Sequence, residues 1–306
     1  MNNDNLFEIV KRYPDPVAEE NYAALVGIDH IKQRIETEAA IMLNPEGIAG
    51  WSEKFYKKEI ELVKIFRRRP PLFVLAGDVG TGKTAFAESF ADKVATSENI
   101  EVFLYKLSLS ARGSGMVGEM TKLIGDAFEQ IRKEAMANAG KKTARILFID
   151  EADALAQSRE TTQMHHEDRS GVNALIRGID SIQNLPIPVL VIMSTNRYSS
   201  IDPAVRRRSA ATFTFNRPSI EQCKILFTKC LNDTGLTEDQ ISRLASLCSP
   251  YDNLSYGYTY SDLTQRVLPS VLLDVYPENQ ITFEAVEKVI HEIPPTAPFN
   301  EFAEEA

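Results

Sequence analysis

Eight consecutive residues, Gly77-Asp78-Val79-Gly80-Thr81-Gly82-Lys83-Thr84, have the types and spacing of a phosphate-binding loop. Glycines let backbone N–H groups converge on an anion, and a helix that starts there presents the positive end of its dipole to the same anion. In such a loop Lys83 reaches the β- and γ-phosphates of a nucleoside triphosphate, and the Thr84 hydroxyl ligates Mg²⁺. We therefore expect all eight residues to contact a nucleotide, with ATP and Mg²⁺ as the cofactors.

Two acidic residues follow a second apolar run. Residues 146–149 are continuously apolar and predict a strand that is buried on both faces, and Asp150 and Glu151 come directly after it. Carboxylates at the end of a buried strand are costly unless they serve a metal or a water molecule. We expect Asp150 to belong to the Mg²⁺ shell and Glu151 to activate or orient the attacking water. Asn196 follows the apolar run 189–193 and could hydrogen-bond the γ-phosphate or that water.

The elements around these residues predict an α/β fold. Apolar runs at 72–76, 102–107, 146–149, 189–193 and 211–215 predict five strands. Apolar residues at helical spacing predict helices near 28–42, 52–66, 119–137 and 170–183, and then 219–231, 237–248 and 261–273. We expect a short helix and an irregular segment over 1–25, and a solvated polar loop over 157–169, including His165 and His166. The composition changes near residue 217, which predicts a large domain over 1–217 and a small helical domain with an acidic tail over 218–306.

Composition narrows the classes of function. The 306 residues carry a net charge of −9, which disfavours an extended basic face for duplex nucleic acid. The three cysteines lack metal-type spacing and predict reduced thiols, the N-terminus is polar, and no apolar run reaches the roughly 20 residues of a membrane span. We expect a cytoplasmic protein without membrane contact. The basic run Arg67-Arg68-Arg69 is compatible with a helix C-terminus or with a phosphate or nucleic-acid contact.

Four spaced motifs together resemble AAA+ ATPases. The phosphate loop resembles their Walker A motif, residues 146–153 resemble Walker B, residues 194–196 resemble sensor 1, and residues 202–208 resemble the arginine-finger segment. The resemblance implies a P-loop NTPase with a five-stranded parallel sheet sandwiched by helices and a small C-terminal helical lid. It also implies a homo-oligomeric ring, usually a hexamer, with ATP beside Gly27. Arg207 and Arg208 align best with the arginines that act on a neighbouring subunit.

A narrower resemblance is carried by residues 260–269. Their Ser-(x)4-Arg-x-Leu-Pro spacing is similar to the sensor 2 stretch of the pachytene-checkpoint type ATPases, which remodel HORMA proteins and also occur in bacterial antiphage operons. This resemblance implies that Arg266 contacts the nucleotide and that Met116, Val117 and Gly118 form the loop that grips substrate in a central pore. Packing of Met116 in the core is the alternative. Leu263 stands where that family often carries its sensor arginine, and Met116 stands where it carries an aromatic residue.

Three functions are compatible with these motifs. The first is an ATPase that partly unfolds a partner protein, with a HORMA protein as the partner that the resemblance suggests. The second is a nucleic-acid machine of the clamp-loader, transposition or helicase-loader type. The third is a nucleotide switch without turnover, which the presence of Glu151, Arg207 and Arg208 argues against. The acidic net charge and the arginine string favour the first function and make nucleic acid an unfavoured substrate.

Overall fold

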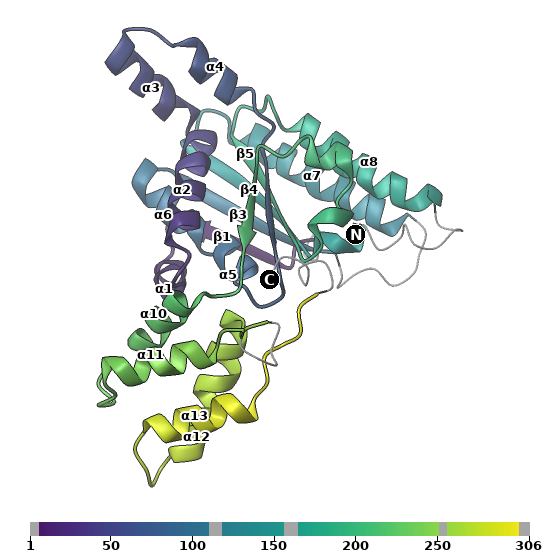
Figure 1. Cartoon of the computed structure of the whole chain (residues 1–306). Coiled ribbons are helices and arrows are strands. Elements are labelled where there is room, and N and C mark those ends of the chain that lie inside the picture. The colour runs from purple at the N-terminus through teal and green to yellow at the C-terminus, as the bar shows by residue number, and fades with distance from the viewer. Residues whose placement is uncertain (1–5, 110–117, 156–164, 251–255, 300–306) are drawn as a thin grey trace. The chain divides into compact units, whose positions relative to one another are not determined.

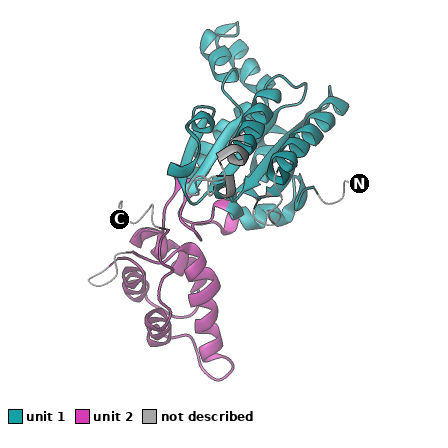
Figure 2. Ribbon diagram, turned by 90° about the vertical axis from the view of Figure 1, so that its right-hand side faces the viewer, with its two compact units in different colours: residues 1–22, 30–76, 84–213 teal, residues 23–29, 77–83, 214–306 magenta. Residues whose placement is uncertain are grey.

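A computed structural model describes residues 6–109, 118–155, 165–250 and 256–299 of the chain. The chain forms two compact units, each built from several segments (Figure 2). Unit 1 contains residues 1–22, 30–76 and 84–213, and unit 2 contains residues 23–29, 77–83 and 214–306. The expected boundary between residues 217 and 218 stays a prediction.

A six-stranded sheet forms the centre of unit 1, in the order β1-β3-β4-β5-β2-β6. The strands are β1 (Ile9–Tyr13), β2 (Leu72–Gly77), β3 (Glu101–Ser108), β4 (Thr143–Asp150), β5 (Val189–Thr195) and β6 (Ala211–Phe215). Adjacent strands from β3 through β4 and β5 to β2 pair in parallel. Every residue of β2, β4 and β5 is buried, as expected of parallel strands covered on both faces.

Helices cover both faces of this sheet (Figure 1). The helices α7 (Glu119–Ala137) and α8 (His165–Ser181) lie on one face, where Ile124, Phe128 and Leu175 pack against apolar residues of β3, β4 and β5. The helices α2 (Asp29–Leu43) and α6 (Phe90–Glu98) lie on the other face and bury one apolar stripe each. The remaining helices of this part are α1 (Pro16–Ala24), α3 (Pro45–Tyr56), α4 (Glu61–Arg67), α5 (Lys83–Ala87) and α9 (Pro203–Arg206).

The α/β class and the five expected strands are confirmed, but the N-terminal segment differs from the prediction. Residues 9–13 form a sixth strand, β1, which pairs antiparallel with β3 instead of forming an irregular segment. Ile9, Lys11 and Tyr13 share one face of this strand, but the segment is short and Pro14 and Pro16 follow directly. The sequence alone therefore does not predict a strand here. Backbone hydrogen bonds to the edge of β3 therefore decide this element.

Two other expectations near helices were wrong. The single helix predicted over 52–66 is interrupted, because Lys57 adopts a left-handed conformation and ends α3. The buried Ser52 hydroxyl stabilises the turn to α4 by donating to the Lys58 carbonyl at 2.8 Å and accepting from the Ile60 N–H at 3.0 Å. The loop predicted over 157–169 is shorter than expected, because α8 already begins at His165; residues 156–164 lie outside the described part of the chain.

The helices of unit 2 share a second hydrophobic core. They are α10 (Ile220–Cys230), α11 (Glu238–Leu247), a π-helical segment η5 (Asp262–Val267), α12 (Leu268–Val275) and α13 (Phe283–Glu292). Phe227, Leu244 and Val286 are among the residues buried between them. Capping boxes at Ser219 and Thr237 fix where α10 and α11 begin. None of the helices in the described ranges is long and apolar enough to cross a membrane.

Candidate functional site

Thr84 and Asp150 meet at the carboxyl end of the sheet in unit 1. The Thr84 hydroxyl lies 3.2 Å from each carboxylate oxygen of Asp150, at the end of β4. Asp150 is almost fully buried. Oxygen ligands about 2.1 Å from an octahedral Mg²⁺ are separated by about 3 Å, so a hydroxyl and a carboxylate at this spacing fit two neighbouring positions of its shell.

The turn after β4 sets the position of Glu151. Its backbone N–H donates to Asp150 Oδ1 at 3.1 Å and to the Ser194 hydroxyl at 3.2 Å, and Ser194 in turn donates to Asp150. Glu151 has a φ of 54°, a left-handed conformation that is uncommon for a residue with a side chain. The local hydrogen bonds hold this conformation and leave the Glu151 side chain exposed next to the buried Asp150.

A buried lysine that the sequence analysis did not single out also contacts Asp150. Lys106 Nζ lies 3.3 Å from Asp150 Oδ2 and 2.8 Å from Glu88 Oε1. Burial lowers the pKa of Lys106, but the hydrogen bond that Lys106 donates to Glu88 and the charges of Glu88, Asp150 and Glu8 together raise it above its usual value, so the side chain stays charged. A single charge within the apolar run 102–107 is the signal that could have identified it.

Asp153 fixes the segment that carries Asn196. Its carboxylate accepts from the Thr195 hydroxyl and from the backbone N–H groups of Asn196 at 3.0 Å and Arg197 at 3.3 Å. Ile149 and Met193 are paired residues of β4 and β5, so Glu151 and Asn196 both lie just beyond the same edge of the sheet. The structure thus places Thr84, Asp150, Glu151 and Asn196 at one end of unit 1, and their roles stay a prediction. Asp153 was missed, although it belongs to the same acidic run as Asp150.

The two arginines expected to act on a neighbour have different surroundings. Arg208 forms a bidentate ion pair with Asp180 of α8, with distances of 2.9 Å and 3.1 Å. Arg207 is exposed, and among the described residues its side chain has no hydrogen-bond or ion-pair partner. Arg207 is therefore the arginine that is available to a second molecule.

The phosphate loop itself belongs to unit 2, apart from Thr84. Gly80 and Gly82 have φ values of 77° and 97°, which only glycine adopts without strain. A Cβ on Gly80 would also lie 2.7 Å from the Thr259 hydroxyl. Lys83 is buried, and its ammonium donates to the carbonyls of Gly77 at 2.9 Å and Asp78 at 2.8 Å. The Lys83 charge thus lies next to the backbone of the loop.

Asp78, the second residue of the loop, is held by an arginine. Arg217 Nε donates to Asp78 Oδ2 at 2.9 Å, and its guanidinium also donates to the Gly257 carbonyl. The Asp78 carboxylate further accepts from the N–H groups of Val79 at 2.8 Å and Phe299 at 3.2 Å. These contacts neutralise an acidic side chain inside a loop whose expected ligand is an anion. Arg217 was not predicted as a site residue.

The other residues expected at the nucleotide are also in unit 2. The Gly27 carbonyl accepts from the Gln222 side chain, and Gly27 has a φ of 80°. Arg266 donates to Asp262 Oδ1 at 2.7 Å. Burial would raise the pKa of Asp262, but hydrogen bonds from Thr296 and Thr259 hold it below its usual value, so Asp262 is an anion that orients Arg266.

The expected substrate loop lies mostly outside the described part of the chain. Met116 and Val117 are in the range 110–117, which the structure does not describe. Gly118 is described as the residue before α7, with a φ of 85°. The role of these three residues stays a prediction.

Comparisons with known proteins identify the family of the chain. The model of the "ATPase family associated with various cellular activities (AAA)" matches residues 73–218. CD-NTase-associated protein 6 from Escherichia coli (strain MS 115-1) is 46% identical to this chain over 300 residues, which cover 97% of this chain and 96% of that protein.

Two solved structures extend the similarity to the fold. A chain of the E. coli MS115-1 HORMA:CdnC:Trip13 complex superposes with a TM-score of 0.87 at 46% identity, covering 96% of this chain and 97% of that chain. Rhizobiales Trip13 superposes with a TM-score of 0.75 at 42% identity, covering 95% of this chain and 100% of that chain.

Proposed function

Because the chain belongs to the AAA ATPase family and, within it, to the group of CD-NTase-associated protein 6, we propose that it hydrolyses ATP to remodel a HORMA protein in a bacterial antiphage system. The observation that carries this proposal is the 46% identity, over nearly the whole chain, to a protein solved together with a HORMA protein and CdnC. The residue types of the phosphate loop and of Thr84, Asp150 and Glu151 support the ATPase part of the proposal.

The proposed roles follow from the contacts described above. The N–H groups of the loop 77–83 and the Lys83 ammonium bind the β- and γ-phosphates. Thr84 and Asp150 hold Mg²⁺, which neutralises phosphate charge when it is bound. Glu151 accepts a proton from the attacking water, and Asn196 orients that water or the γ-phosphate. Gly27 and Arg266 contact the nucleotide as well.

We further propose that the active form is a ring, with six copies as the family suggests. Arg207 then acts on the ATP of the neighbouring copy, with Arg208 as the alternative that the resemblance leaves open. Met116, Val117 and Gly118 grip the partner's chain in the central pore. An unbranched Met side chain adapts to varied apolar surfaces, which suits a loop that moves along a peptide.

The test combines nucleotide binding, phosphate release and partner stimulation. We expect Lys83→Ala to abolish nucleotide binding, and Glu151→Gln to keep ATP bound while turnover is lost. A HORMA protein from the same host should stimulate the wild-type ATPase, whereas Met116→Ala should keep basal turnover and lose that stimulation. Stimulation by DNA instead of the HORMA protein would favour the nucleic-acid function, and wild-type turnover by Glu151→Gln would contradict the assigned role of Glu151.

A further inference from the structure

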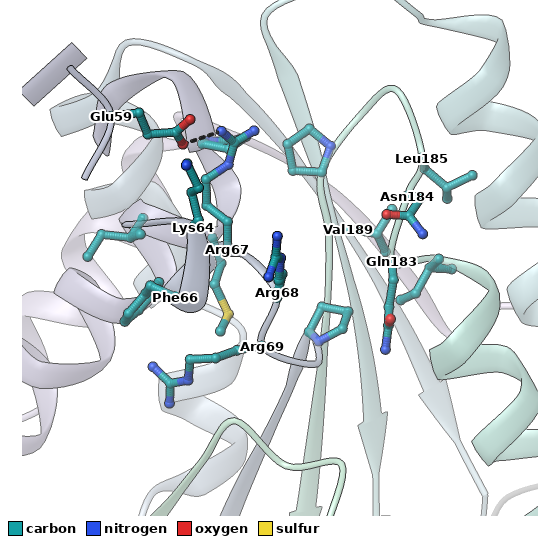
Figure 3. Close-up of a pocket in the computed structure, with 16 residues that line it drawn as sticks. Glu59, Lys64, Phe66, Arg67, Arg68, Arg69, Gln183, Asn184, Leu185 and Val189 are labelled. Atoms are coloured by element: carbon teal, nitrogen blue, oxygen red, sulfur yellow. Dashed lines mark hydrogen bonds and ion pairs between the residues drawn. The ribbon is translucent and has the colours of Figure 1, made fainter. Parts of the chain in front are cut away.

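A hollow of about 480 Å³ opens in unit 1, in a part of the unit that includes none of the residues assigned to nucleotide (Figure 3). One wall consists of α4 and the residues just after it, and the other consists of the connection between α8 and β5. Basic side chains predominate on the first wall: Lys64, Arg67, Arg68 and Arg69 line the hollow together with one carboxylate, Glu59. This local excess of positive charge contrasts with the net charge of −9 for the chain.

Three of these four cations already have partners. Arg67 pairs with Glu59 at 2.9 Å, Lys64 pairs with Glu61 at 3.2 Å, and Arg69 pairs with Glu38 at 3.1 Å. The Arg68 guanidinium is different, because within the described ranges it has no hydrogen-bond or ion-pair partner. Figure 3 shows Arg68 between the two walls of the hollow. Arg68 is therefore a charged donor that is available to an anion.

The opposite wall offers hydrogen-bonding and apolar groups. Gln183 and Asn184 are exposed, and among the described residues their side-chain amides have no hydrogen-bond partner. Leu185 and Pro188 line the same wall. Side-chain amides can donate to and accept from a peptide backbone, and the apolar groups can contact its side chains. The wall facing Arg68 thus has the chemistry that an extended peptide needs.

The surroundings of the hollow favour a protein over a nucleic acid as the occupant. The helix α3, which is joined to α4 by a short turn, exposes Trp51, Phe55 and Tyr56 on its surface. These residues do not line the hollow, but Trp, Tyr and Arg are the residue types that contribute most to protein–protein binding. A duplex would also meet the repulsion of an acidic chain. A carboxylate of a protein segment can pair with Arg68 and carries far less charge than a duplex, so it meets less of that repulsion.

We propose that this hollow binds an acidic segment of the HORMA partner, with a carboxylate of that segment paired to Arg68. The inference rests on the proposed function, which supplies the identity of the partner, and it adds a docking site whose lining includes none of the residues proposed to grip substrate. Docking at α4 holds the partner on the AAA chain while the pore loop engages another part of it.

The experiment measures binding of the fluorescently labelled HORMA protein to full-length chain in a slowly hydrolysed ATP analogue. We expect Arg68→Glu to raise the Kd about 10- to 100-fold at about 50 mM NaCl, because an attraction becomes a repulsion. The difference should shrink at about 300 mM NaCl, where screening is stronger. Arg68→Gln, which keeps α4 free of a new negative charge at its C-terminus, should raise the Kd about 5-fold.

Arg177→Glu is the matched control. Arg177 is exposed on α8 and has no ion-pair partner among the described residues. Arg177→Glu therefore makes the same change of charge outside the hollow, and it should alter the Kd less than about twofold. Basal ATPase and melting temperature should stay near wild type in all three variants. Wild-type affinity in Arg68→Glu would overturn the docking site alone, whereas failure of the wild-type chain to bind the HORMA protein would overturn the proposed function and the docking site with it.

Two further outcomes would replace the proposed occupant. A change in oligomer mass in Arg68→Glu, measured by light scattering, would place the hollow between copies of this chain. Binding of a labelled DNA duplex that is lost in Arg68→Glu and kept in Arg177→Glu would assign the hollow to nucleic acid. Either result would overturn the proposal of an acidic protein segment.

Discussion

Lys106 lies 3.3 Å from Asp150 and connects this proposed Mg²⁺ ligand to Glu88, whose second carboxylate oxygen lies 3.0 Å from Lys11. Lys11 of β1 and Lys106 of β3 thus supply the ammonium groups that pair with Glu88 and Asp150. The side chains of Lys106, Glu88 and Asp150 are all largely buried. A buried charge that loses its partner is strongly destabilising. The free energy of unfolding of the chain should therefore depend on these ion pairs.

The first prediction concerns the stability of this charged group. Lys106→Met keeps the apolar stem but removes the charge, which leaves Asp150 without an ammonium and Glu88 with Lys11 alone. We expect a loss of about 1–3 kcal/mol in the free energy of unfolding. Lys93→Met, at an exposed position of α6, is the control and should change stability by less than about 0.5 kcal/mol. Equal effects in urea titrations would contradict the proposed coupling.

The same group predicts a pH dependence. Burial raises the pKa of Glu88, but the hydrogen bonds from Lys106 and Lys11 outweigh this and hold it below its usual value of 4.5. A carboxyl with a lowered pKa in the folded state stabilises the fold above its unfolded pKa, and this contribution is lost as the pH falls through the folded pKa. Lys106→Met removes one of these hydrogen bonds, so the melting temperature of the variant should begin to fall at a higher pH than that of wild type.

The second prediction concerns Asp78 in the phosphate loop. Arg217→Met leaves the Asp78 carboxylate without its ion pair, and an uncompensated negative charge beside bound phosphates repels them. We expect the Kd for ATP to rise about 10-fold, which is about 1.4 kcal/mol. Asp78→Asn combined with Arg217→Met removes the repulsion, so the double variant should bind ATP more tightly than Arg217→Met alone. Fluorescent-nucleotide titrations measure all three proteins, and a double variant that binds more weakly than Arg217→Met would contradict the charge argument.

Much of the fold could be predicted because local patterns determine it. The continuous apolar runs of β2, β4 and β5 are long and lack competing polar signals, so the core of the sheet was expected correctly. The strand β1 and the break between α3 and α4 could not be predicted in this way. One depends on pairing with β3, and the other depends on the Ser52 hydroxyl bonding to the backbone six and eight residues away. Neither contact follows from the spacing of apolar residues on which the prediction was based.

The candidate site shows the same division. The spacing of the phosphate loop and the acids after β4 identified Thr84, Asp150 and Glu151, which the structure places together. Lys106, Asp153 and Arg217 were missed because their roles depend on contacts with residues that are distant in the sequence. The contacts of Lys106 and Asp153 form only once β3, β4 and β5 are paired. The contact of Arg217 forms only once the segment after β6 packs against the phosphate loop. The residues that we propose to bind the nucleotide are therefore easier to find in the sequence than the residues that position them.

The third prediction tests Asp153 as a positioning residue. Asp153→Asn keeps the size of the side chain but loses the charge that accepts from the N–H groups of Asn196 and Arg197. We expect kcat to fall about 10-fold, while the Kd for ATP changes less than about twofold, because the phosphate loop is untouched. Asp126→Asn on the exposed face of α7 is the control and should retain wild-type kcat. A parallel rise in the Kd for ATP would indicate a structural role instead.

The fourth prediction separates the two candidate arginines. Arg207 is exposed and lacks a partner among the described residues, whereas Arg208 is paired to Asp180 within its own unit. An arginine that stabilises the transition state in a neighbouring copy is worth about 10³–10⁵ in rate. Arg207→Ala should therefore reduce ATPase activity at least about 100-fold without a change in melting temperature. Arg208→Ala should mainly lower the melting temperature, because Asp180 loses its partner. The reverse pattern would assign the role to Arg208.

Mixing two inactive variants decides whether Arg207 acts between copies. Lys83→Ala subunits cannot bind ATP but keep Arg207, and Arg207→Ala subunits bind ATP but lack the arginine. In a mixed ring, an interface that joins an intact phosphate loop to an intact Arg207 is complete, so part of the ATPase activity should return. The returned activity should depend on the mixing ratio and be greatest near equal amounts, because complete interfaces form only between unlike subunits. Mixed rings that are confirmed by mass and remain inactive at every ratio would show that Arg207 does not act on a neighbour.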